Sequence, residues 1–279
     1  TVMVSGIDYA DPAQHIMIKA GGVVANLVAK NNLSDWEMGI SLKPFDIVTP
    51  DLTLKSNGAE YQLDGQLTPD NLFVGKAKLD IPNFVLHAEN TDIKMDKLVL
   101  NIDTDLVDKL YNSTLKLEFN QLAVNNDPYG PAQLVLNIDK IDGTAFNAFI
   151  KQKAAIEDDD TLSYQEKMDK IKLLTPQILQ TYAKGSSIDI SQFDVTVPEG
   201  MIKFSANVKF PVATTQLTNM VDVLTFVKGV HATVKAQAPS AKITKILDSM
   251  MPTPVAAPVS PATPETSGTA ANPAPQTAP

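Results

Sequence analysis

Residues 187–197, SIDISQFDVTV, contain the pattern that decides the fold. Ile188 and Ile190 alternate with polar residues, and the alternation then resumes at Phe193 after two intervening residues instead of one. Alternation with a period of two is typical of a strand with one buried face. A slip of one residue would turn the next apolar residues to the opposite face, unless a β-bulge or a sharp bend absorbs it. The stretch therefore predicts an irregular strand whose two halves face the same core.

The same slip occurs in three earlier stretches of the chain. They are Ile40-x-Leu42 before Phe45-x-Ile47, Leu79-x-Ile81 before Phe84-x-Leu86, and Leu117-x-Phe119 before Leu122-x-Val124. The residues at the four slips are Lys43-Pro44, Pro82-Asn83, Asn120-Gln121 and Ser191-Gln192. Proline is confined to edges and bulges of sheets, so the two prolines support an irregularity. The hexapeptide LVLNID at 98–103 recurs at 134–139, which indicates a repeated unit of one bulged strand and its return strand.

Helices are expected between the third and fourth units and near the end of the chain. Thr144 is expected to cap a helix ended by the acidic run 157–160, and Ser163-x-x-Glu166 is a capping box. Thr175-Pro176 is interpreted as an N-cap and first helical residue, with Lys184-Gly185 as a stop. Two more helices are expected, with inward faces formed by Leu217, Met220, Val221 and Leu224, and by Ile243, Ile246, Leu247 and Met250. Between them, residues 230–236 alternate as a strand, whereas residues 1–35 give conflicting signals.

These patterns predict an α+β, mainly β fold: a long curved antiparallel sheet of repeated bulged hairpins with a few amphipathic helices packed on it. Residues 1–251 are expected to form a single domain, with a helical insertion at about 144–185. Residues 252–279 are rich in proline and alanine, so a disordered tail is predicted there. Such a tail serves as a passive spacer or as a PxxP-type recognition peptide.

Composition excludes several classes of function. The 23 basic residues are all lysine, and the net charge is −9. Nucleic-acid recognition relies on a basic surface and on bidentate arginine, so nucleic acid is not expected as a partner. Absence of cysteine rules out disulfides and thiolate chemistry without fixing the compartment.

The sequence contains no motif for catalysis, metal binding or a cofactor, so no residues are assigned to such sites. His15, His87 and His231 are far apart and are interpreted as ordinary surface histidines. The acidic run 157–160 lacks the spacing and glycine of a calcium loop. Asn112-Ser113-Thr114 matches a glycosylation sequon, a triplet that often arises by chance.

Residues 115–211 resemble the YdgA-like family of bacterial envelope proteins, a domain of unknown function. The resemblance rests on Tyr129-Gly130-Pro131, the strand LVLNIDKID, the helix start at 144–150, the segment Leu173-Leu174-Thr175-Pro176 and the strand pair 187–211. The resemblance implies a location on the periplasmic side of the inner membrane. It also implies an N-terminal membrane anchor, which is expected to lie outside this chain, and it implies no catalytic residues.

Three functions remain open at this point. The first is a non-enzymatic envelope protein that holds a lipid or another hydrophobic ligand on the concave apolar face of the sheet. The second is a protein–protein scaffold that uses sheet edges or the tail to bind envelope proteins. The third, least favoured, is a hydrolase with a site built from scattered carboxylates. The sequence does not fix the oligomeric state or the ligand.

Overall fold

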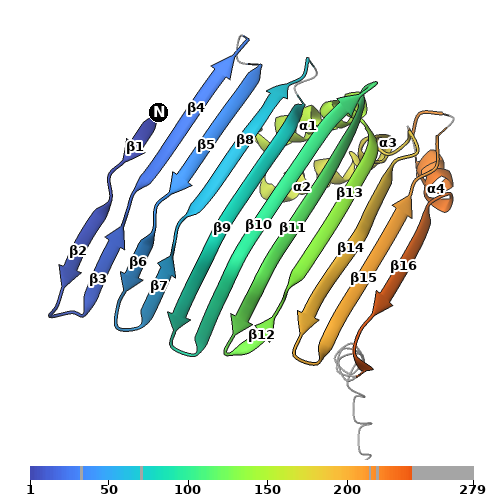
Figure 1. Cartoon of the computed structure of the whole chain (residues 1–279). Coiled ribbons are helices and arrows are strands. Elements are labelled where there is room, and N and C mark those ends of the chain that lie inside the picture. The colour runs from blue at the N-terminus through green and yellow to red at the C-terminus, as the bar shows by residue number, and fades with distance from the viewer. Residues whose placement is uncertain (32–33, 70–71, 214, 218–219, 241–279) are drawn as a thin grey trace, which may run out of the picture. The chain divides into compact units, whose positions relative to one another are not determined.

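The computed structural model describes residues 1–31, 34–69, 72–213, 215–217 and 220–240. In this part, the chain forms one open, curled, 16-stranded antiparallel sheet with four helices (Figure 1), which confirms the predicted fold. The strands are β1 (Val2–Val4), β2 (Ile7–Asp11), β3 (Ile16–Ala20), β4 (Val23–Lys30), β5 (Asp35–Leu42), β6 (Phe45–Val48), β7 (Leu52–Ser56), β8 (Ala59–Leu67), β9 (Phe73–Ala88), β10 (Thr91–Val107), β11 (Leu110–Val124), β12 (Asp127–Tyr129), β13 (Ala132–Asp142), β14 (Ser187–Val197), β15 (Gly200–Lys209) and β16 (His231–Gln237). The helices are α1 (Gly143–Glu157), α2 (Tyr164–Lys172), α3 (Thr175–Gln180) and α4 (Met220–Lys228).

The first three slips lie on a single line across the sheet. Between β9 and β10, Asn83 pairs with Asp96 and Ile81 with Leu98, and the position between these pairs is skipped. The pairing between the other neighbouring strands from β1 to β13 is interrupted at the same position along the strands. Beyond the interruption, each pairing resumes without a change of register. We call this the break line; it passes through Ser5-Gly6, Gly21-Gly22, Lys43-Pro44, Asn57-Gly58, Pro82, Lys97, Asn120 and Gly130-Pro131. The slips are therefore bends shared by neighbouring strands, with no extra residue in any one of them.

The fourth slip is a true β-bulge. In β14, Ile190 pairs with Ala206 and Phe193 with Phe204, so two residues of β14 oppose only Ser205 of β15. The register of β14 with β13 shifts at the same place. The predicted bulge at Ser191-Gln192 is thus confirmed.

Glycine and two polar side chains hold the break line between β7, β8 and β9. Gly58 has φ +103°, and a Cβ atom at this position would lie 2.2 Å from the carbonyl oxygen of Leu42. The buried Ser56 hydroxyl donates to the carbonyl oxygen of Asn83 at 2.7 Å and accepts from the Gly58 N–H at 3.1 Å. The Asn57 N–H donates to the Asn83 side chain at 2.8 Å. The backbone groups freed by the interrupted ladder are therefore partly satisfied by side chains.

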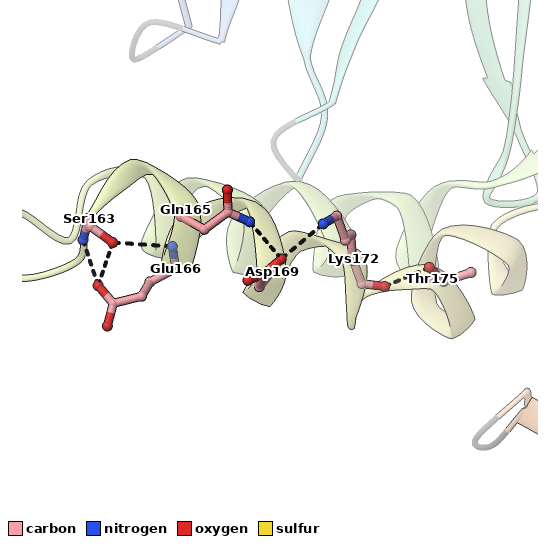
Figure 2. A network of polar contacts seen from close by, with 6 residues as sticks. All are labelled: Ser163, Gln165, Glu166, Asp169, Lys172 and Thr175. Atoms are coloured by element: carbon pink, nitrogen blue, oxygen red, sulfur yellow. Dashed lines mark hydrogen bonds and ion pairs between the residues drawn. The ribbon is translucent and has the colours of Figure 1, made fainter. Parts of the chain in front are cut away.

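Helices α1 to α3 lie between β13 and β14, where the helical insertion was predicted. The capping box is confirmed: the backbone N–H of Ser163 donates to Glu166 Oε2 at 2.8 Å, and the Glu166 N–H donates to Ser163 Oγ at 3.3 Å (Figure 2). The predicted cap at Thr144 is wrong, because Asp142 is the N-cap and accepts from the Ala145 N–H at 3.1 Å, so that α1 begins two residues earlier than expected. As expected, α1 ends in the acidic run 157–160, with Glu157 as its last residue and Asp158 as its C-cap.

The predicted cap at Thr175 is also displaced by one residue. Leu174 is the N-cap of α3 and makes no side-chain capping bond. Thr175 is helical, and its hydroxyl instead donates to the Lys172 carbonyl oxygen at 2.6 Å (Figure 2). The Thr175 hydroxyl therefore binds a carbonyl group at the C-terminus of α2 instead of capping α3. It can reach this carbonyl group because only one residue separates Thr175 from Leu173, the C-cap of α2.

A buried apolar cluster lies among the helices and consists of Ala183, Leu217, Val223 and Phe226. Other buried apolar side chains lie in or beside the strands, such as Leu72 and Val74 at β9 and Val197 in β14. Tyr182, Phe210 and Phe226 stack in sequence, with ring centroids 4.5 and 6.2 Å apart. The predicted inward face is correct for Leu217, which is buried in this cluster, and wrong for Val221 and Leu224, which are 71% and 56% exposed. In α4, Val223 and Phe226 face the cluster instead, each 5% exposed. Apolar residues surround most of this helix, so their spacing does not select one face.

The ends of the chain complete the comparison with the sequence. Residues 1–30 form four strands, and the Asp11 side chain closes a turn by accepting from the N–H groups of Ala13 and Gln14. The predicted strand near residues 230–236 is confirmed as β16. Residues 1–240 form one compact unit. The predicted helix around Ile243–Met250 and the tail at 252–279 lie outside the described residues and stay predictions.

Candidate functional site

Three rows of side chains cross the sheet on one face, perpendicular to the strands. Paired residues in a sheet project from the same face, so the strand registers identify each row. The longest row consists of Val2, Ala25, Ile40, Tyr61, Leu79, Leu100, Leu117, Leu134, Phe193, Phe204 and Ala236. A parallel row consists of Leu27, Met38, Leu63, Ala77, Ile102, Leu115, Leu136, Ile190, Ala206 and Val234. A third row, described next, runs beside the break line. We call the three rows together the apolar rows.

The third apolar row is aliphatic and aromatic as well. It contains Val4, Val23, Leu42, Ala59, Ile81, Leu98, Phe119, Ala132, Val195 and Ile202. The longest row crosses eleven strands, which corresponds to about 48 Å at roughly 4.8 Å per strand. In these three rows, Tyr61 is the only side chain with a polar atom other than the thioether sulfur of Met38.

The apolar rows are accessible along their length. Their members are half-buried or exposed, and none belongs to the buried core. The helices gather near one end of the strands (Figure 1). The ring of Phe146 in α1 stacks on Tyr111, the partner of Leu106 in the β10–β11 ladder, with centroids 6.2 Å apart. The helices therefore cover the end of this face and leave the rows themselves half-exposed.

The opposite face of the sheet is charged. Glu37, Asp64, Lys76 and Asp103 are cross-strand neighbours on β5, β8, β9 and β10. They line a hollow of about 590 Å³ together with Lys30, Asp35 and Asp105. Alternation along each strand thus separates an apolar face from a charged one, as the sequence predicted.

The carboxylates in this hollow are engaged with neighbouring polar groups. Lys30 Nζ lies 2.5 Å from Glu37 Oε1, and this hydrogen bond raises the pKa of Lys30 above 10.5. Lys76 Nζ lies 3.6 Å from Asp103, and Asn112 Nδ2 donates to Asp105 at 2.6 Å. Among the described residues, no group of histidine and carboxylate side chains could hold a metal ion. The hollow gathers several of the scattered acids of the hydrolase hypothesis, and ion pairs and hydrogen bonds occupy most of these acids.

The histidines lie on separate elements. His15 is in the turn between β2 and β3, and His231 begins β16. His87 Nδ1 in β9 lies 3.0 Å from Asp92 Oδ1 in β10. In the acidic run, Asp159 accepts from the hydroxyl and N–H of Thr161, and these bonds lower its pKa below 3.8. The structure therefore does not bring the three histidines together.

The sequence left the ligand-binding residues unassigned, but it contained part of the signal. The odd members of the two hexapeptide copies, such as Leu98 and Leu134, fall in the apolar rows, with the exception of Ile138. Ile40 and Leu42 of β5 belonged to the first slip, but the contributions of β1, β4 and β8 were missed, because residues 1–35 were ambiguous and a row becomes visible only when the registers are known.

The fold and the apolar rows define a class of protein: an open, one-sided antiparallel sheet whose long apolar face stays accessible. The chain belongs to DUF945, a family of bacterial proteins of unknown function, whose model matches residues 1–274. No curated protein and no solved structure matches the chain. Within the described ranges, no helix has both the length and the apolar character needed to cross a membrane.

Proposed function

We propose that this chain is a non-enzymatic protein of the bacterial cell envelope that holds the hydrocarbon chains of lipids on its apolar rows. The observation that carries the proposal is the longest row, which crosses eleven strands without a charged side chain. Burying apolar surface is favourable by roughly 25 cal/mol per Å². A ligand that covers this face would therefore gain affinity from every strand it crosses.

The lack of hydrogen-bonding groups favours hydrocarbon over a peptide as the occupant. Protein interfaces carry about one hydrogen bond per 100–200 Å², and a buried polar group without a partner costs free energy. A peptide laid on the apolar rows would find almost no side-chain partners for its backbone. An acyl chain has no such groups, so it meets the rows without this cost.

The proposed compartment comes from the resemblance of residues 115–211 to the YdgA-like family. It is the periplasmic side of the inner membrane. A protein in that place would meet phospholipids leaving or reaching the inner membrane.

Native mass spectrometry after detergent-free purification is expected to show lipid bound to the chain. To locate it, a photo-reactive p-benzoylphenylalanine replaces Leu117 in one variant and Lys116, on the opposite face of β11, in a matched control. Leu117 is expected to cross-link lipid and Lys116 is not. A chain that never carries lipid, or equal cross-linking from both faces, would contradict the proposal.

A second candidate function is a protein–protein scaffold, and the two open edges of the sheet favour it. Within the part of the chain that the structure describes, β16 is paired only with β15, and its residues are exposed. An envelope protein could add a strand there by β-augmentation. Pull-downs with and without residues 252–279 would separate edge binding from tail binding, because only the latter is lost on truncation.

A further inference from the structure

The outer edge of the sheet at residues 1–11, which we call the β1–β2 edge, combines length with apolar composition. Among the described residues, β1 pairs only with β4 and β2 only with β3. The side chains of Val2, Val4, Ile7 and Tyr9 are 65%, 61%, 60% and 49% exposed. Natural edge strands are usually blunted by lysine, proline or short length. The β1–β2 edge has neither residue and spans two consecutive strands.

The β1–β2 edge is complementary to itself. The break line crosses this edge at Ser5-Gly6. The apolar residues before the break are Val2 and Val4, and those after it are Ile7 and Tyr9, so the alternation shifts from even to odd positions. An antiparallel second copy in which Ser5 faces Gly6 therefore places Val4 opposite Ile7, and Val2 opposite Tyr9. In this register, apolar side chains meet apolar side chains and the two break lines coincide. Moving the register by two residues separates the break lines.

We propose that two copies of this chain pair through their β1–β2 edges, antiparallel about a two-fold axis, to form one continuous sheet. The two-fold axis stands perpendicular to the sheet, so the apolar face of both copies lies on the same side. The row that begins at Val2 in one copy then continues into the row of Tyr9, Ile18 and Ile47 in its partner. This pairing does not depend on bound lipid.

The other edge is less suited to the same contact. β16 has seven residues, with Lys235 near its centre and small Ala232 and Ala236 beside Val234. A pairing of β16 with the β1–β2 edge of another copy would be head-to-tail, and such contacts give open chains instead of closed dimers. A single strand pair buries less than the roughly 1,600 Å² of a standard interface, so the dimer is expected to dissociate on dilution.

Sedimentation velocity of the full chain tests the proposal. We expect a monomer–dimer equilibrium that shifts with concentration and contains nothing larger. Ile7→Lys is expected to abolish the dimer, whereas Val234→Lys, at a side chain of matching exposure on the opposite edge (60% and 63%), is expected to leave it intact. A monomer at all concentrations, open-ended growth, or equal effects of both variants would overturn the proposal.

Disulfide cross-linking tests the register independently of these variants. The chain has no cysteine, so introduced pairs report without background. The double variant Val4→Cys with Ile7→Cys is expected to form a covalent dimer on oxidation. The pair Val2→Cys with Ile7→Cys, which reports the register shifted by two residues, is expected not to. The opposite pattern would overturn the proposed pairing.

Discussion

Gly58 shows how one residue supports the break line. Its φ of +103° is unfavourable for a side chain, and a Cβ atom there would overlap the Leu42 carbonyl oxygen. We expect Gly58→Ala to lower the free energy of unfolding by roughly 1–3 kcal/mol or more. Gly39→Ala is the matched control in β5, because a Cβ atom at Gly39 meets nothing within 4 Å. Denaturant titration compares the two variants, and equal losses would contradict this account of the break line.

Glu166 in the capping box provides a test by pH. The Ser163 hydroxyl and then its N–H donate to this carboxylate and lower its pKa below the ordinary 4.5. Because the pKa of Glu166 is lower in the folded state than in the unfolded state, its ionised carboxylate stabilises the fold at pH values above the unfolded-state pKa. This contribution is lost as the pH falls through the folded-state pKa. Carbon-detected NMR is therefore expected to give Glu166 a midpoint below 4.5, which returns toward that value in Ser163→Ala. An unchanged midpoint in this variant would show that the box does not hold the carboxylate.

At the scale of elements, the bulge in β14 explains an otherwise irregular pattern. Deleting Ser191 would leave Ile190 and Phe193 separated by one residue, which restores regular alternation with the same face apolar. We expect this deletion to keep the fold, losing the bond from Asn137 Nδ2 at 3.3 Å. Deleting Ser205 from the regular β15 is the control, because it turns half of that strand over. Circular dichroism melting would contradict the interpretation if both deletions cost the same.

Elements with a single apolar face were predictable from sequence, and the others were not. β15 alternates from Ile202 to Lys209 without interruption, so its period determined both its type and its face. In α4, apolar residues lie on nearly every side, and packing against Tyr182 and Phe210 selected Val223 and Phe226. The cap of α1 was misplaced by two residues because Asp142 and Thr144 both suit that role. In both α1 and α4, the local sequence thus offered more than one suitable choice, which accounts for the wrong cap and the wrong inward face.

At the scale of the whole molecule, the apolar rows depend on pairings between distant parts of the chain. The slips were visible in the sequence, but their alignment on one line across neighbouring strands was not. Each strand of the sheet contacts mainly its two neighbours, as in a repeat protein. The buried cluster of Ala183, Leu217, Val223 and Phe226 lies among the helices and packs against Phe210, next to the end of β15. The free energy of local opening is therefore expected to differ between the two ends of the sheet.

Phe226→Ala tests this unequal stability. Removing a buried phenylalanine typically costs about 3–5 kcal/mol. Because Phe226 packs with Leu217, Val223 and Phe210, we expect amide exchange to accelerate in the helices and in β14 to β16, while β4, β5 and β8 keep their protection. Leu224→Ala, at an exposed position on the same helix, is the control and is expected to change little. An equal loss of protection in every strand would instead mean that the sheet and helices unfold as one cooperative unit.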